Sequence, residues 1–195
     1  MKNLITVSLE TKQALRGAIF EAFFVVLGVG LAYIANEWRQ TRKDRLHEEQ
    51  ALSAIHAEME TNLETLKESL TYHKALLQML FSKHDEGWTP KPQDFSRGFV
   101  SPAQLSRTSW ESASLTGVLA KTSFAQVSQL SNIYAHQERY EIQAQSVGTL
   151  IYEALFYQGT ASVVENHRNL AAIISTFVYR ETDLLNLYEK TLDSM

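Results

Sequence analysis

Residues 17–36 read GAIFEAFFVVLGVGLAYIAN, and this stretch decides the architecture of the chain. Glu21 is its only formally charged residue. A helix of twenty residues spans about 30 Å, which is the thickness of the hydrocarbon core of a lipid bilayer. We therefore predict one membrane-spanning helix at residues 17–37, preceded by a short N-terminal tail at residues 1–16.

Two other interpretations of this stretch are a buried helix of a soluble protein and a cleaved signal peptide. Its polar flanks are abrupt and the next predicted helix has a different pattern, which disfavours a buried helix. The apolar run is long for a signal peptide, and Tyr33-Ile34-Ala35 is not the small-x-small sequence of a cleavage site. We therefore prefer a permanent anchor in a lipid bilayer.

The predicted span has two different faces. Residues three or four positions apart share one face of a helix, and on one face small residues surround Glu21 and Phe24. Gly28-x-x-x-Ala32 on this face has the small-xxx-small form that lets a second helix approach closely. A carboxylate inside a bilayer is costly without a partner, so Glu21 either pairs with a polar group on a neighbouring span or reaches the interface. The predicted helix-packing face consists of Gly17, Glu21, Gly28, Ala32 and Ala35.

An aromatic residue and a basic run follow the span, as is typical of a membrane–water interface. These predicted interface residues are Trp38, Arg39, Arg42, Lys43 and Arg45. The N-terminal side is also basic, with Lys2, Lys12 and Arg16, so the charge rule for orientation gives nearly a tie. Because a short basic tail resists translocation, we expect a bacterial inner membrane protein whose soluble domain is periplasmic.

Composition narrows the possible functions. Apolar residues make up 45% of the chain and charged residues 21%, which is an ordinary globular balance. The net charge of −4 argues against nucleic acid as a partner. The chain has no cysteine, which excludes disulfides, thiolate chemistry and cysteine-based zinc sites.

Residues 39–84 contain neither Pro nor Gly and predict a long helix that continues from the span. Their apolar residues and two histidines alternate at spacings of four and three, which is a coiled-coil-like heptad seam. The seam consists of Leu52, His56, Met59, Leu63, Leu66, Leu70, His73, Leu77 and Leu80. It packs either inside a bundle or against a second copy, and glutamates such as Glu58 and Glu60 are expected on the other faces.

Pro and Gly gather after residue 85 and predict an irregular crossover at about 85–122. Within it, Ser101-Pro102 is expected to start a short helix. Thr108 is expected to cap another helix, which carries Trp110 and ends near Gly117.

Two more amphipathic helices are predicted after the crossover, one from about 122 to Gln158 and one from about Thr160 to Leu192, with Gly159 as the stop between them. Gly148 is expected to mark a close helix crossing. The expected fold class is therefore all-α: an N-terminal transmembrane helix that continues into a long helix of an antiparallel helical bundle at residues 38–195.

No constellation of residues predicts catalysis. The sequence has no phosphate-binding Gly-rich loop, no His-Glu-x-x-His and no Glu-x-x-His pair for a di-iron site, so we assign no catalytic, cofactor-binding or metal residues. His56 and His73 are interpreted as core or edge histidines. The crossover aromatics either line a ligand pocket or, as we prefer, close the open end of the bundle: Trp88, Phe95, Phe99 and Trp110.

Two parts of the chain resemble a group of uncharacterised bacterial proteins that have one N-terminal span and a helical domain. The first part joins Glu21, Gly28 and Ala32 to Asn36-Glu37-Trp38, and the second joins the residues from Ala57 to Leu63 to Thr108-Ser109-Trp110 and Tyr134. The resemblance implies an architecture and no activity. Glu58 and Asn62, one turn apart, either hydrogen-bond on the long helix or, as we prefer, are surface polar residues.

Arg16-Gly17 before an apolar helix also resembles a type IV pilin anchor. Glu21, however, is the fourth residue after Gly17, whereas the pilin pattern places the glutamate fifth. Strand signals are absent from the rest of the chain, which disfavours a pilin-like subunit.

We therefore predict a non-enzymatic, single-span membrane protein. It would act as an accessory or scaffold subunit that packs on another membrane protein or forms a homo-oligomer. The alternative is a ligand-sensing helical domain that signals through the membrane-proximal helix.

Overall fold

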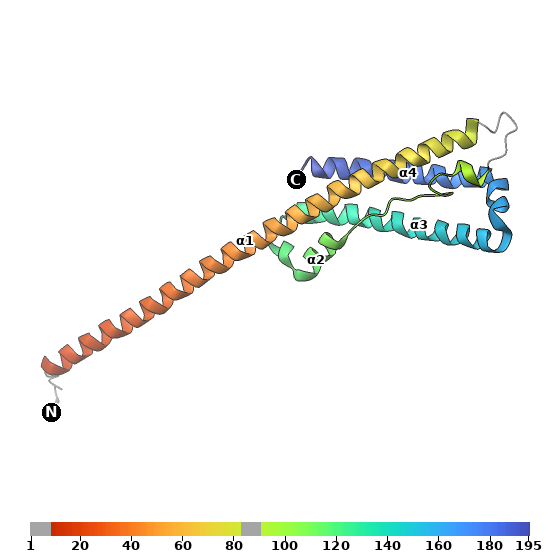
Figure 1. The fold of residues 1–195 in the computed structure, drawn as a ribbon. Coiled ribbons are helices and arrows are strands. Elements are labelled where there is room, and N and C mark those ends of the chain that lie inside the picture. The colour runs from red at the N-terminus through yellow and green to blue at the C-terminus, as the bar shows by residue number, and fades with distance from the viewer. Residues whose placement is uncertain (1–8, 83–90) are drawn as a thin grey trace, which may run out of the picture. The chain divides into compact units, whose positions relative to one another are not determined.

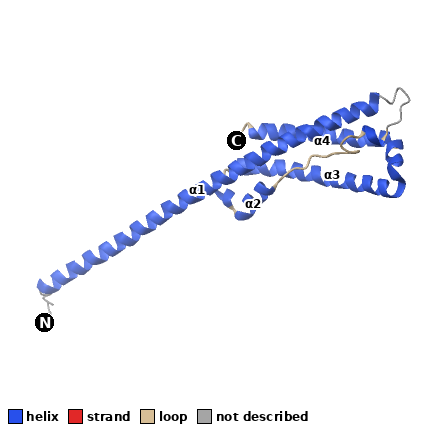
Figure 2. Ribbon diagram, in the orientation of Figure 1, coloured by secondary structure: helices blue, strands red, loops and turns tan. Residues whose placement is uncertain are grey.

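The computed structural model describes residues 9–82 and 91–195, with side chains for residues 16–81 and 91–195. Every regular element in these ranges is helical, which confirms the predicted all-α class (Figure 2). The elements are α1 (Leu9–Ser82), η2 (Pro92–Asp94), α2 (Thr108–Thr116), η3 (Val118–Lys121), α3 (Phe124–Glu165) and α4 (His167–Leu192) (Figure 1). Trp88 and the start of the predicted crossover lie outside the described residues.

The chain divides into two compact units, Met1–His47 and Glu48–Met195, and α1 contributes to both. In the first unit the helix begins at Leu9, inside the segment that we expected to be a tail. Residues 9–16 contain neither Gly nor Pro and are rich in good helix formers, so the helix extends past the apolar segment.

The second unit is an antiparallel bundle of α1, α3 and α4. Asn62 of α1 hydrogen-bonds to Tyr188 of α4, and Ser69 of α1 hydrogen-bonds to Glu181 of α4. The two helices therefore run in opposite directions. The helix α3 is also antiparallel to α4, as shown by three hydrogen-bonded pairs: Gln129–Thr191, Tyr140–Glu181 and Gln143–Thr176.

The heptad spacing predicted on α1 is present, but its seam is rotated toward polar residues. Met59, Leu66, Leu70, His73 and Leu80 are buried as expected, whereas Leu52, His56, Leu63 and Leu77 are only partly buried. The buried face also includes Ile55, Asn62, Ser69 and Leu76. The prediction missed Asn62 and Ser69 because an apolar pattern passes over polar side chains that are buried with partners.

The crossover differs from the prediction around Ser101-Pro102. Residues 99–107, which we call the connecting segment, form no helix and run as irregular chain between the bundle helices. The helix α2 follows with Arg107 as its N-cap and no side-chain cap of its own, so Thr108 is not the cap. Gly117 ends α2 as predicted, in the left-handed conformation (φ 68°) that glycine adopts without strain.

The apolar core of the bundle is built in two parts. One part lies around Met59, Leu130 and Phe177, and the other joins the ends of α1 and α4 to Phe95 of the crossover. Phe95 packs 4.7 Å from Phe99 between ring centroids, so these two aromatics belong to the core.

Two glycines of α3 have different environments. Gly159 has φ 77° and ψ 175°, and it interrupts the helix at the predicted stop, although helical structure resumes and α3 continues to Glu165. Gly148 is helical, and a Cβ built on it meets nothing within 4 Å, so the predicted close crossing there is wrong.

The two glycines give a matched test. Gly159 occupies a backbone region that is essentially restricted to glycine, so Gly159→Ala should lower the free energy of unfolding by about 1–3 kcal/mol. Gly148→Ala should raise it by about 0.5–1 kcal/mol, because alanine is the better helix former and space is free. Urea unfolding of both full-length variants in detergent measures the difference, and an equal effect of the two would contradict this account.

Candidate functional site

The apolar segment of α1 is exposed along its whole length. An 18-residue window of this helix has a mean hydropathy of 2.2, and none of it is buried. By length and composition, this is the one helix in the described residues that could cross a membrane. A core helix of a soluble protein would be mostly buried, so the exposure disfavours that interpretation.

The predicted helix-packing face lies on this exposed segment. Gly17, Glu21, Gly28, Ala32 and Ala35 are all exposed, and a Cβ added at Gly17 or Gly28 would meet nothing within 4 Å. Glu21 makes no hydrogen bond or ion pair with any described residue. Nothing in the part of the chain that the structure describes therefore packs on this face.

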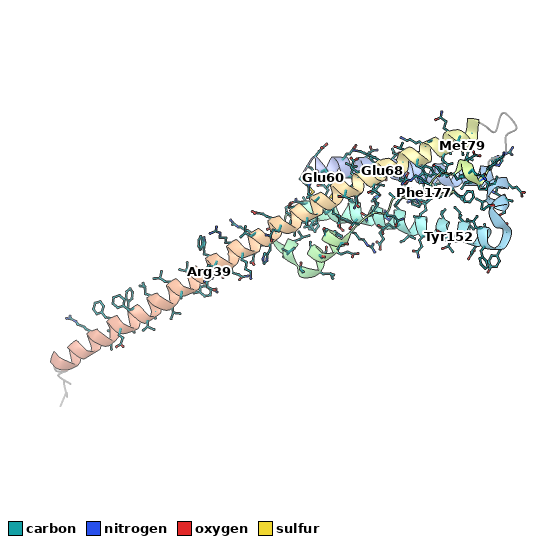
Figure 3. All side chains as sticks on the ribbon, viewed as in Figure 1. Arg39, Glu60, Glu68, Met79, Tyr152 and Phe177 are labelled. Atoms are coloured by element: carbon teal, nitrogen blue, oxygen red, sulfur yellow. The ribbon has the colours of Figure 1, made fainter. Side chains whose placement is uncertain are left out.

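The predicted interface residues follow one another along the same helix, where Figure 3 labels Arg39. The guanidinium carbon of Arg42 lies 5.9 Å from the ring centroid of Trp38, which is a cation–π distance. Arg39, Lys43 and Arg45 are exposed. An aromatic ring paired with a cation suits the border between lipid and water.

The centre of the bundle contains polar side chains that the sequence analysis did not bring together. They are buried and joined by hydrogen bonds, and we call them the polar core: Glu58, Asn62, Ser69, His73, Tyr134, Gln137, Tyr140, Glu181 and Tyr188. They come from α1, α3 and α4, and several of them bind the connecting segment.

Glu58 of α1 is the first centre of the polar core. Its carboxylate accepts hydrogen bonds from the Tyr134 hydroxyl, the Ser106 hydroxyl and the backbone N–H of Ser109, each at 2.8 Å. The N–H of Trp110 points to Oε1, the oxygen that also accepts from Tyr134, at 3.5 Å. Ser109 and Trp110 lie in the first turn of α2, so Glu58 caps this helix although it is about fifty residues away in the sequence. Its negative charge also lies at the positive, N-terminal end of the helix dipole.

Asn62, one turn after Glu58 on α1, uses its side-chain amide to bind both backbone groups of one residue of the connecting segment. Its Oδ1 accepts from the N–H of Ser106 at 2.8 Å, and its Nδ2 donates to the carbonyl of Ser106 at 2.7 Å. Gln137 of α3 donates to the same carbonyl at 3.1 Å. Tyr188 of α4 connects the two amides, because it accepts from Asn62 and donates to Gln137.

Glu181 of α4 is the second centre, and it is fully buried. The Tyr140 hydroxyl donates to its Oε1 at 2.8 Å, and the Ser69 hydroxyl lies 2.9 Å from the same oxygen. His73 Nδ1 lies 2.9 Å from Oε2.

The bonding pattern of His73 indicates the tautomer of its neutral ring. The backbone N–H of Ser101 donates to Nε2 at 3.3 Å, and a backbone N–H can only donate. The proton of a neutral imidazole is then on Nδ1 and is donated to Glu181. As predicted, His73 is a core histidine; its hydrogen bonds also hold the connecting segment.

Burial raises the pKa of three tyrosines of the polar core above the usual value. For Tyr134, the hydrogen bond and charge of Glu58 raise the pKa further. For Tyr140, the charge of Glu181 does the same. For Tyr188, the hydrogen bond from Asn62 partly offsets the effect of burial. All three therefore stay protonated and donate to the acceptors around them.

The polar core has the chemistry of a structural centre. His73, Tyr140 and Glu181 are at most 1% exposed, so a dissolved substrate does not reach them. Within the described ranges, no group of three or more His, Cys, Asp or Glu residues is arranged to hold a metal ion. The donors and acceptors fasten the connecting segment to α1 and α3, and Glu181 and Tyr188 of α4 bind the side chains that hold it.

Residues of the second part of the resemblance, from α1, α2 and α3, meet at one place. Glu58 binds Tyr134 and the first turn of α2, and Trp110 stacks on Tyr134 with 5.2 Å between ring centroids and 6° between planes. Glu58 and Asn62, interpreted as surface residues, are therefore buried contacts between helices. The expectation was wrong because both side chains have partners far away in the sequence.

Comparisons of the chain with protein-family models, with curated proteins and with solved structures find no match. The function must therefore be argued from the chain's own geometry.

A substitution at Glu58 tests the first centre. Glu58→Ala removes the cap of α2 and leaves the Tyr134 hydroxyl without its acceptor, so the free energy of unfolding should fall by about 3 kcal/mol. Glu60→Ala, two residues away on an exposed side chain, is the control and should change it by less than about 0.5 kcal/mol. Denaturant unfolding of the full chain measures both, and similar losses for the two variants would show that Glu58 has no special role.

Proposed function

We propose that this protein is a non-enzymatic, single-span membrane protein that acts as an accessory or scaffold subunit. The observation that carries the proposal is the exposed apolar segment of α1, with its open face of Gly17, Glu21, Gly28, Ala32 and Ala35. Apolar side chains on this scale are not left in water, and a bilayer covers them. The small-residue face then suits a second membrane helix.

Glu21 restricts which side chains the proposed partner can present to it. A carboxylate on a membrane helix usually faces another protein or a water-filled cavity and pairs there. The partner span would therefore offer a basic or hydrogen-bond-donating side chain opposite Glu21. This partner is either another membrane protein or a second copy of the chain.

The bundle supports a scaffold better than a sensor. Its polar groups satisfy one another around Glu58 and Glu181, so they are not free to recognise a ligand. A rigid domain on an anchor positions a partner without chemistry of its own. The resemblance to bacterial proteins with one span and a helical domain agrees with this architecture.

We further propose that the membrane is the bacterial inner membrane and that the bundle lies in the periplasm. Lys2, Lys12 and Arg16 would hold the N-terminus inside. The chain has no cysteine, so Ser194→Cys introduces a single thiol. An impermeant thiol reagent should label it in cells with a permeabilised outer membrane, and labelling only after lysis would place the bundle in the cytoplasm.

The packing face is tested by substitution within the span. Gly28→Leu fills the small-residue face, and recovery of the partner in a pull-down from mild detergent should fall at least tenfold. Val26→Leu, outside the face, keeps the helix equally apolar and should leave recovery unchanged. Mass spectrometry identifies what is recovered. If both variants behave like the original chain and only the chain itself is recovered, the scaffold proposal fails.

A further inference from the structure

The residues that follow the apolar segment of α1 include one aromatic and four cationic side chains, which we call the basic side: Trp38, Arg39, Arg42, Lys43 and Arg45. All five are exposed, and Figure 3 labels Arg39 among them. None of the four cations makes an ion pair with any residue that the structure describes. Their charges are therefore available to an anion from outside the described part of the chain.

The cations are gathered on one side of the helix. Trp38, Arg42 and Arg45 follow one another at spacings of four and three, which places them in one row along the helix. Arg39 and Lys43, four residues apart, form the row beside it. The guanidinium carbon of Arg42 lies 5.9 Å from the ring centroid of Trp38, so the aromatic ring holds one of the cations on this side.

The acids of the same stretch lie on the opposite side. Asp44 is two positions from Arg42, which is about 200° around the helix, and Glu37 is seven positions before Asp44 on the same face. The next acids, Glu48 and Glu49, lie about 15 Å further along the axis than the start of the basic side. This separation exceeds the Debye length of about 8 Å at physiological salt. Close to the apolar segment, the positive charge is therefore not cancelled.

The kind of anion follows from the position along the helix. The cations begin directly after the apolar segment, so in a bilayer they reach the headgroup layer, which is roughly 5–7 Å thick in each leaflet. From Arg39 to Arg45 the helix rises about 9 Å, and long basic side chains bend toward the interface. Lipid phosphates are the anions of this layer, and a guanidinium binds phosphate through paired hydrogen bonds.

We propose that the basic side binds the phosphate groups of anionic phospholipids, in preference to zwitterionic lipids, in the leaflet on the C-terminal side of the span. Anionic lipid attracts basic residues next to a membrane helix, and each cation adds to the attraction. The inference rests on the proposed span and adds a lipid preference to it. An acidic segment of a partner protein is the competing occupant, and lipid is favoured because the cations lie at the level of the headgroups.

Fluorescence quenching of Trp38 in lipid nanodiscs tests the proposal. The full-length chain is placed in discs of phosphatidylcholine with a minor fraction of phosphatidylglycerol. Bromine, which quenches an indole at close range, is carried on the acyl chains of either the phosphatidylglycerol or an equal fraction of the phosphatidylcholine. Subtracting the signal of a Trp38→Phe chain isolates the signal of Trp38. The anionic lipid should associate with this site at least threefold more strongly than the zwitterionic one, and 0.5 M NaCl should weaken the preference.

Substitutions assign the preference to the basic side. Arg42→Gln should lower it at least twofold, and glutamine at all four cations should bring it within about 1.5-fold of parity. Arg16→Gln, an exposed cation at the other end of the span, is the control and should leave the preference unchanged. Quenching by brominated phosphatidylcholine in every variant checks that the ring stays at the interface.

The outcomes separate this inference from the proposed span. Equal quenching by the two lipids, or a preference that survives glutamine at all four cations, would overturn the lipid proposal while the span stands. Equal quenching would also favour an acidic protein partner for the basic side. If neither brominated lipid quenches Trp38, the ring is not at a bilayer surface, and the proposed span fails together with this inference.

Discussion

Two carboxylates, Glu58 and Glu181, lie inside the bundle, and the cost of removing them from water constrains the residues around them. A buried carboxylate is tolerated only when donors surround it. Glu58 obtains its donors from Tyr134, Ser106 and the first turn of α2. Glu181 obtains them from α1 and α3. Each carboxylate thereby determines which segments must come together.

This requirement explains why an irregular segment lies against the helices. The backbone of residues 99–106 is not part of a helix, so its N–H and carbonyl groups need other partners. His73 accepts from Ser101, Tyr140 accepts from Ala103, and Asn62 pairs with both backbone groups of Ser106. Polar groups in a core contribute less to stability than apolar ones of the same shape. Here they select one position for the connecting segment among many.

The sequence predicts the parts of the fold that depend on apolar periodicity and on helix breakers. The apolar segment, the heptad spacing of α1, the stop at Gly117 and the break at Gly159 are all local signals. The polar core has no such local signal, because its residues are buried against partners that lie up to 126 positions away in the sequence. Glu181 lies between Phe177 and Leu184 at heptad spacing, and a polar residue at an expected core position is the signal that could have found it.

The first unit follows another constraint. Among the described residues nothing packs on the small-residue face around Gly28, whereas the buried carboxylates of the bundle find their donors within the bundle itself. An exposed, apolar helix with a small-residue face joined to a self-contained domain is the basis for the proposed scaffold role. In that role the bundle must keep a fixed shape, and the two carboxylate centres provide it.

The central claim is that these buried carboxylates and their neighbours hold the connecting segment as firmly as a helix. Amide hydrogen exchange of the full chain in detergent tests this claim directly. The amides of Ser101, Ala103, Ser106 and Ser109 should be protected to the level of the Leu66 and Leu130 amides in the core helices, and Glu181→Gln should lower the protection of Ser101 and Ala103 first. Rapid exchange at these four positions, at rates typical of a solvent-exposed loop, would contradict the account.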